Sequence, residues 1–451
     1  MSALRQTAKS APTDASRRIT SRRALEALRA GVPNRDAVAA LGSLQTGVED
    51  RFSQLLESVR SSAEHAGLTD AKSTDAKSPA ATASGPGMLI GGGFGAGKSH
   101  VLEYLAHMAL DAGFVVSKVV ISKETPLHDP AKLYRAAIDE ARLPDRPGSA
   151  IDEIAAGLKT QSNEYASLYR WLHTDDAPVD SRFAASLFLH EHARGDAEFA
   201  DRIVRFWAGD PLPISDLRRR LKEAGAATTY RLASVKEREL SVQRFRFVSR
   251  LVRAAGYAGW VLLIDEVELI GRYTQLQRAK SYAEVARWVR GDRDDPGAPL
   301  GAVLTTVEDF AAQVLVGKND VELIPKKLRL KGTAEHDRLA SSAETGMRII
   351  EREQLRLQPP DRDELDRTYA KLKSIHGEAY GWVPPDVEGL ERLPSNRMRQ
   401  YVRAWINAWD LRLLDPSYEP EITTSEVAID FSEDADLEGS DDQPNGSGND
   451  G

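Results

Sequence analysis

Residues 92–99 form the most informative chemical motif in the sequence. They read Gly-Gly-Phe-Gly-Ala-Gly-Lys-Ser and match the pattern G-x-x-x-x-G-K-[ST]. Glycines in such a loop accept positive φ angles and let the backbone approach an anion, while successive N–H groups form a nest for phosphate oxygens. The alternative is a merely flexible glycine-rich turn. A predicted strand before the loop and a predicted helix after it favour phosphate binding.

The loop predicts ATP and Mg²⁺ as cofactors. Lys98 is expected to reach the β- and γ-phosphate oxygens, and the hydroxyl of Ser99 is expected to coordinate Mg²⁺. The positive end of the following helix adds to the attraction for phosphate. The predicted nucleotide contacts are Gly92, Gly93, Phe94, Gly95, Ala96, Gly97, Lys98, Ser99 and His100.

A second motif lies at 261–266, where Val-Leu-Leu-Ile is followed by Asp265 and Glu266. Asp265 is expected to hold Mg²⁺, partly through water, and Glu266 is expected to activate the attacking water as a general base. An apolar run that ends in two acids often marks only the end of a strand. Together with the loop upstream, it predicts hydrolysis of ATP.

Two further residues are candidates for the same chemistry. Thr306 follows the apolar part of a predicted strand at 300–306 and is expected to orient water near the γ-phosphate; the alternative is a Thr that caps a helix at 308–315. Arg397, at the start of a C-terminal helix, is a candidate sensor of the γ-phosphate, or else part of a solvated helix edge. Three arginines are unranked candidates for an arginine finger: Arg329, Arg338 and Arg348.

Two other patterns carry weaker signals. The alternating run 326–331 predicts a basic strand, which either meets DNA phosphates or protects a sheet edge from aggregation. His190 and His192 are two residues apart, so on a helix their rings point away from each other, which argues against metal binding.

Strand and helix patterns alternate from residue 88 onward and predict an α/β fold: a parallel sheet with flanking helices, a large helical insertion and a smaller all-α lid domain. The acid pair lies more than 160 residues after the loop, which is why 140–255 is expected to be an insertion. The predicted organisation is a flexible basic arm at 1–20, a helical segment at 21–60, a disordered linker at 61–87, an ATPase domain at 88–356, a helical lid at 357–415 and an acidic disordered tail at 416–451.

Composition narrows the function classes. The 451 residues include no Cys, so disulfides, thiolate zinc sites and cysteine nucleophiles are excluded. No run of apolar residues has the length of a signal peptide core or a membrane span, and we expect a soluble cytoplasmic protein without membrane contact. The net charge is −8, but the acidic tail conceals a charge of +3 on residues 1–416, so contact with DNA stays open.

Four segments of the chain resemble the ATP-binding proteins of bacterial phage-exclusion (BREX) systems, of the BrxD type: 22–38, 91–105, 115–138 and 262–272. The resemblance spans most of 21–412. It implies an AAA+-type ATPase of antiphage defence that works beside a methyltransferase, a phosphatase-like protein and often a helicase. It also implies that the 22–38 segment lies near the adenine.

The sequence therefore predicts a Mg²⁺-dependent ATPase that remodels or loads a DNA-bound defence complex, with an ATP-dependent homo-oligomer as one assembly state. One alternative is a nucleotide-gated switch or scaffold with little hydrolysis. Another is a direct binder of duplex DNA through the basic arm and residues 326–331. A small-molecule kinase also has such a loop, but the acid pair and the helical lid favour the ATPase.

Overall fold

The computed structural model describes residues 14–31, 34–66, 85–144, 146, 148–192, 195–387 and 398–418. They form two compact units. The first unit falls within Met1–Thr46, Gly92–His107 and Leu357–Ala428, and the second within Gly47–Gly91, Met108–Arg356 and Ile429–Gly451. Within the described residues, no helix has the length and apolar character that crossing a membrane requires.

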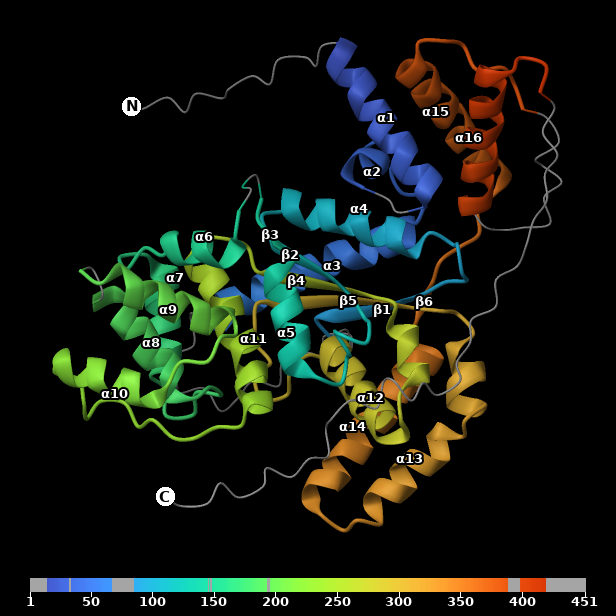
Figure 1. Ribbon diagram of the computed structural model, residues 1–451. Helices are drawn as coiled ribbons and strands as arrows, with labels where there is room; N and C mark the ends of the chain where they lie inside the picture. The colour runs from blue at the N-terminus through green and yellow to red at the C-terminus, as the bar shows by residue number, and fades with distance from the viewer. Residues whose placement is uncertain are drawn as a thin grey trace, which may run out of the picture. The chain divides into compact units, whose positions relative to one another are not determined.

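The second unit is built on a six-stranded sheet in the order β3-β2-β4-β5-β1-β6 (Figure 1). Every neighbouring pair is parallel except β2 and β3. The α/β class with a mostly parallel sheet is therefore confirmed. The strands are β1 (Gly87–Gly91), β2 (Val115–Val120), β3 (Ala141–Arg142), β4 (Trp260–Asp265), β5 (Leu300–Thr306) and β6 (Leu355–Arg356).

The register of the central strands brings three strand ends to one edge of the sheet. Gly91, the last residue of β1, pairs with Thr306, the last residue of β5. Ile264 of β4 pairs with Leu304 of β5, so Asp265 ends β4 at the level of Thr305. Because these strands are parallel, their carboxyl ends form the edge where open α/β sheets bind ligands.

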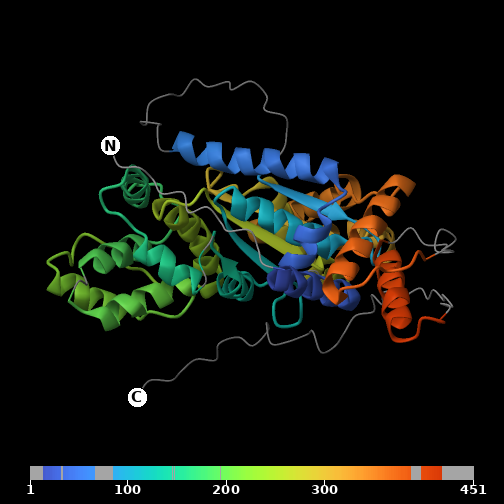
Figure 2. The same cartoon turned by 90° about the horizontal axis from the view of Figure 1, so that it is seen from above.

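Helices cover both faces of the sheet. One core contains Leu262, Ala302 and Leu304 together with side chains from α5 (Pro130–Asp139), α11 (Glu237–Ala254) and α12 (Gln275–Arg290). Side chains alternate along a strand, so Gly301 faces the other way. There a Cβ at Gly301 would approach Leu55 to 2.8 Å, which places the long helix α3 (Thr46–Ala66) on the second face (Figure 2). The apolar stripe predicted at 52–59 is the buried side of α3.

Helices predominate between β3 and β4, as the sequence predicts for 140–255. They gather beside the sheet (Figure 1) and pack their aromatic residues into the same core, with Trp207 fully buried. The N-terminal five are α6 (Ala150–Ala156), α7 (Asn163–Leu172), α8 (Ser181–His192), α9 (Ala197–Ala208) and α10 (Ile214–Glu223). The chain then returns to the sheet through α11.

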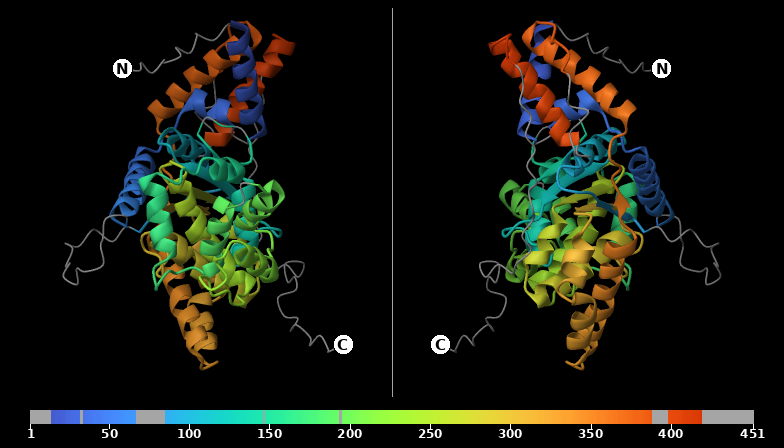
Figure 3. Two further views of the ribbon diagram at one scale, coloured as in Figure 1. Left: turned by 90° about the vertical axis from the view of Figure 1, so that its left-hand side faces the viewer. Right: turned by 90° about the vertical axis from the view of Figure 1, so that its right-hand side faces the viewer.

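Beyond β5 the chain forms a short π-helix, η2 (Ala311–Val316), and then a hairpin of α13 (Asp320–Arg329) and α14 (Ala334–Arg352) that projects from the sheet (Figure 3). The basic strand predicted at 326–331 is wrong, because most of this run belongs to α13. The buried positions of α13 are Asp320, Ile324, Pro325 and Leu328, whereas Leu330 is 76% exposed. The lysine–leucine alternation imitates a strand, but burial follows the helical period.

The first unit has a core of its own, made by helices from both ends of the chain. Leu25, Leu372, Trp405 and Trp409 are among its buried residues. The helices are α1 (Asp14–Ala30), α2 (Arg35–Leu41), α15 (Arg362–Tyr380) and α16 (Met398–Leu414). Helix α1 begins at Asp14, inside the range that was expected to be a flexible arm, because its apolar face is buried by α15 and α16.

Candidate functional site

The predicted site residues are divided between the two units. The loop 92–99 and His100 belong to the first unit, whereas Asp265, Glu266 and Thr306 belong to the second. Arg397 lies outside the described residues. Chain connectivity links the two groups, because Gly92 directly follows Gly91 at the carboxyl end of β1.

The loop has the backbone that its glycines predict. Gly95 and Gly97 have φ angles of 81° and 97°, values that side chains other than glycine rarely accept. A Cβ at Gly97 would meet no atom within 4 Å, so the restriction at this position comes from backbone conformation and not from crowding. The residues present therefore fit a loop that presents its N–H groups to an anion.

Lys98 and Ser99 open the helix α4 (Lys98–Asp111) at the end of this loop. The ammonium of Lys98 donates to the carbonyl of Gly92, with 3.0 Å between Nζ and O. The side chain thus folds back along the loop, and its charge lies near the first-turn N–H groups. This arrangement suits an anion rich in oxygen atoms. A phosphate oxygen of such an anion would replace the Gly92 carbonyl as the acceptor for Lys98.

Within the first unit, helix α16 contacts the loop at Phe94, and the end of α2 contacts His100 of α4. Arg399 donates to the carbonyl of Gly31 at 2.6 Å, and its guanidinium carbon lies 5.8 Å from the ring centroid of Phe94. His100 Nε2 lies 2.7 Å from the carbonyl of Gly42, so this nitrogen carries the proton and donates. His100 was predicted as a nucleotide contact, and its described partner is the end of α2.

The end of β4 is a buried polar cluster in the second unit. Asp265 is 3% exposed, and its Oδ1 accepts hydrogen bonds from the hydroxyl of Thr305 at 2.5 Å and from the backbone N–H of Glu266 at 3.0 Å. Charge-assisted bonds of this kind fix the orientation of a carboxylate. Thr305 therefore helps to orient Asp265, a contact that the sequence did not predict, and the water-orienting role of Thr306 stays a prediction.

Glu266 has an unusual backbone. Its φ and ψ angles are 61° and 35°, in the left-handed region, and only Asn319 shares a positive φ among the described non-glycine residues. Such strain costs on the order of 1–3 kcal/mol and concentrates at functional sites. The turn directs the chain away from β4 and leaves the Glu266 carboxylate exposed, while Asp265 stays buried.

Thr306 and the three candidates for an arginine finger lie in different environments. Thr306 is buried at 1% exposure, and η2 has no side-chain cap, so the alternative of a capping Thr finds no support. Among the arginine-finger candidates, Arg329 forms a two-point ion pair with Glu344 at 2.7 and 2.8 Å. Arg338 and Arg348 are exposed on α14.

The described residues alone do not complete the coordination shell of a metal ion. Within the described residues, no group of three His, Asp or Glu side chains is arranged to hold a metal. Mg²⁺ normally takes one or two protein ligands and completes its shell with phosphate oxygens and water. The carboxylate of Asp265 in the second unit and the hydroxyl of Ser99 in the first are each chemically suited to be such a ligand, and a bound ion would neutralise charge on the phosphates.

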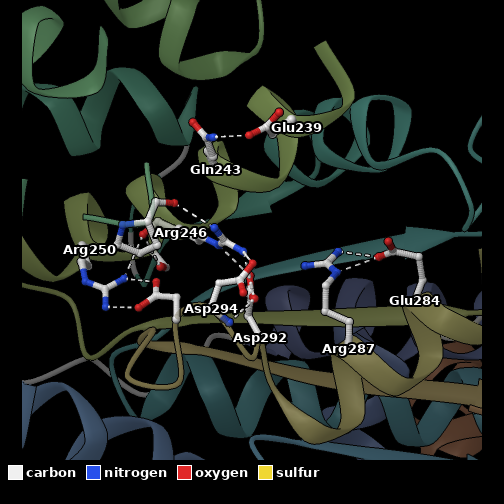
Figure 4. A network of polar contacts seen from close by, with 11 residues as sticks. Glu239, Gln243, Arg246, Arg250, Glu284, Arg287, Asp292 and Asp294 are labelled. Atoms are coloured by element: carbon white, nitrogen blue, oxygen red, sulfur yellow. Dashed lines mark hydrogen bonds and ion pairs between the residues drawn. The ribbon is translucent and has the colours of Figure 1, made fainter. Parts of the chain in front are cut away.

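A second polar network holds the opposite, amino end of β5 (Figure 4). Arg246 of α11 donates to both carboxylate oxygens of Asp292, at 2.7 and 3.0 Å, and to Asp294 at 2.9 Å. Arg250 pairs with Asp295 at 2.5 and 2.6 Å. These bonds anchor the loop that precedes β5 to the last insertion helix, so they serve the scaffold.

The fold and the loop define an α/β protein with a phosphate-loop motif after the first strand of a mostly parallel sheet. The family model described as "BREX system ATP-binding protein BrxC/D" matches residues 78–409, more than half of the chain. The chain belongs to this family, which confirms the resemblance, the binding of ATP and a role in the BREX antiphage system. Comparison with curated proteins and with solved structures gave no match.

Proposed function

We propose that this chain hydrolyses ATP in a Mg²⁺-dependent reaction, with the loop 92–99 as the phosphate site and Asp265 and Glu266 as the catalytic acids. One observation carries the proposal. The loop leaves β1 at Gly91, and Gly91 pairs with Thr306 at the same sheet edge where β4 ends in Asp265. The covalent start of the phosphate loop and the acid pair thus share one edge.

Each residue has a distinct chemical task in this proposal. Lys98 neutralises charge on the β- and γ-phosphates, and Ser99 and Asp265 hold the ion. Glu266 takes a proton from water as it attacks the γ-phosphorus, while the bond to the β–γ bridging oxygen breaks and ADP leaves. Thr305 orients Asp265. The sensor role of Arg397 remains a prediction.

Two substitutions test the proposal. Lys98→Ala should abolish binding of Mg·ATP, because the loop loses its only side-chain cation. Glu266→Gln should keep binding but lower the hydrolysis rate by roughly 10²–10⁴-fold, the usual contribution of a general base. Binding is measured by calorimetry and turnover by phosphate release. Lys159→Ala and Glu164→Gln, at exposed positions beside α7, are the matched controls and should leave both quantities unchanged.

The outcome separates the two classes of function. If Lys98→Ala loses nucleotide but Glu266→Gln turns over at the wild-type rate, the acid pair has no catalytic role and the nucleotide-gated switch is the better account. Unchanged binding and turnover in both variants would contradict the nucleotide site altogether. A turnover per subunit that rises with protein concentration would indicate an active site completed by a second copy.

We further infer that the ATP cycle acts on other BREX proteins at a DNA-bound complex in the cytoplasm. Membership of the family supports this, because a defence system requires its ATP-binding protein to communicate with its other proteins. A helicase, a methyltransferase or a phosphatase-like protein would be the partner, and an ATP-dependent homo-oligomer the active assembly. Size measurement with and without a slowly hydrolysed ATP analogue tests the oligomer: an unchanged mass would contradict it.

A further inference from the structure

A row of exposed cations lies on the helical insertion, away from the residues proposed for catalysis. We call it the basic strip. Residues 214–239 contain seven Lys and Arg against four Asp and Glu. Six of these cations are exposed, and the five that form no ion pair with any described residue define the strip: Arg218, Lys222, Arg231, Lys236 and Arg238.

The strip is continuous because a hydrogen bond joins its two segments. Arg218 and Lys222 are four residues apart and share one side of α10, whose Leu217 and Leu221 are buried. Arg218 Nη2 donates to the carbonyl of Leu232 at 3.0 Å, so the segment that carries Arg231 lies against the exposed side of α10. The chain then runs directly into the first turn of α11.

Three of the four acidic neighbours of the strip are paired with other arginines, and the fourth, Glu239, accepts a hydrogen bond from Gln243 at 3.4 Å. Asp216 pairs with Arg202 at 2.5 Å, and Glu237 pairs with the buried Arg244.

Glu223 likewise pairs with Arg220, at 3.3 Å. Within the part of the chain that the structure describes, no ion pair involves any of the five strip cations. The surface therefore keeps a net positive charge that only an outside anion can compensate.

We propose that the basic strip binds the phosphate backbone of double-stranded nucleic acid. Protein interfaces use buried aromatic or aliphatic anchors, and single-strand binding uses exposed aromatics for base stacking. Among the described residues from 195 to 275 no large apolar side chain is exposed. A strip of Arg and Lys without such anchors suits the regular negative charge of a duplex. The proposal is independent of ATP hydrolysis.

A comparison of two triple variants tests this proposal. The first replaces Lys222, Arg231 and Arg238 by Gln, three cations whose side chains form no hydrogen bond in the described structure. The matched control replaces Lys326, Lys327 and Lys331 by Gln, in the run for which the sequence left contact with DNA as one alternative. Affinity for a labelled duplex of roughly 30 base pairs, about three helical turns, is measured against salt concentration.

The full-length wild type should bind the duplex, with an affinity that falls steeply as salt rises. In the strip variant the slope of log K against log salt should decrease by about 2.7, or about 0.9 for each lost phosphate contact, while the control keeps the wild-type slope. Single variants at the same three positions should each decrease the slope by about 0.9. The single variants therefore still test the proposal if the triple variant folds poorly.

Four results would overturn the proposal. The wild type fails to bind the duplex at low salt; the strip variant keeps the wild-type slope; the α13 control loses as much as the strip variant; or a single strand of equal length binds more tightly than the duplex. Competition by polyglutamate as effective as that by the duplex would instead identify the strip as a site for an acidic protein.

Discussion

At the scale of single residues, the acid that ends β4 has its orientation fixed by its neighbours. Asp265 accepts hydrogen bonds from Thr305 and from the backbone of Glu266, and the left-handed turn at Glu266 separates the two carboxylates. One acid is buried and oriented, as a metal ligand must be, and the other is exposed, as a base that meets water must be. Environment thus assigns two roles to adjacent residues.

This assignment predicts different effects for the two threonines that end β5. Thr305→Val removes the bond to Asp265 and should lower the ATP hydrolysis rate by about tenfold, equivalent to ~1.4 kcal/mol. Thr305→Ser keeps the hydroxyl and should retain most of the rate, and Thr306→Val should have a smaller effect. A larger loss in Thr306→Val than in Thr305→Val would instead favour the original sequence prediction.

The sequence could predict the chemical types of these residues but not their partners. The loop pattern predicts that Lys98 and Ser99 bind phosphate and metal. The apolar run before two acids predicts the roles of Asp265 and Glu266. The choice between Thr305 and Thr306 needs the register of β4 against β5, which long-range pairing determines. The contact of Arg399 with Phe94 could not be predicted either, because the sequence shows only that Arg399 lies near Arg397 at the start of a helix.

At the scale of elements, the helical insertion is attached to the sheet by ion pairs. Arg246 and Asp292, which are 10% and 14% exposed, form the centre of this attachment. Burial alone would raise the pKa of Asp292, but the hydrogen bonds and charge of Arg246 outweigh it and hold that pKa below its ordinary value. The stabilisation from this carboxylate is present at neutral pH and is lost as pH falls through the lowered pKa.

Asp292→Asn should therefore lower the free energy of unfolding at pH 7 by roughly 2 kcal/mol, because Arg246 loses its two-point carboxylate partner and keeps only the exposed Asp294. The deficit should begin to shrink as the pH falls below about 3.9, where the unfolded wild-type carboxyl becomes protonated, and should disappear once the pH is below the lowered pKa of the native Asp292. Asp294→Asn is the matched control: its partner is the same Arg246, but Asp294 is 76% exposed. In this control the free energy of unfolding should fall by less than about 1 kcal/mol. Urea unfolding across pH measures this, and a pH-independent deficit would contradict the assignment.

Elements differed in how well the sequence predicted them. The stripe of α16 at Tyr401, Trp405 and Trp409 follows the helical period and is buried as predicted. At 326–331 the same kind of reasoning failed, because lysines and leucines alternate over a segment too short to distinguish a period of 2 from one of 3.6.

At the scale of the whole molecule, helices from the N-terminal and C-terminal parts of the chain pack together, which local sequence patterns do not predict. Helices α1 and α2 were expected as a separate segment, yet they share one core with α15 and α16. Ser21 donates to Glu378 at 2.8 Å, and Arg29 pairs with Asp410 at 2.7 Å. Such pairings join residues more than 350 positions apart, a separation over which periodicity carries no information.

The central proposal is that the phosphate loop 92–99 and Asp265 act on a single Mg·ATP. Its most direct test is the affinity for Mg·ATP, by calorimetry, in the wild type, Ser99→Ala, Asp265→Asn and the double variant. If both side chains hold the same ion, each single variant should weaken binding only in the presence of Mg²⁺, and the double variant should lose clearly less than the sum of the two losses. Fully additive losses, or wild-type affinity in Asp265→Asn, would contradict the account.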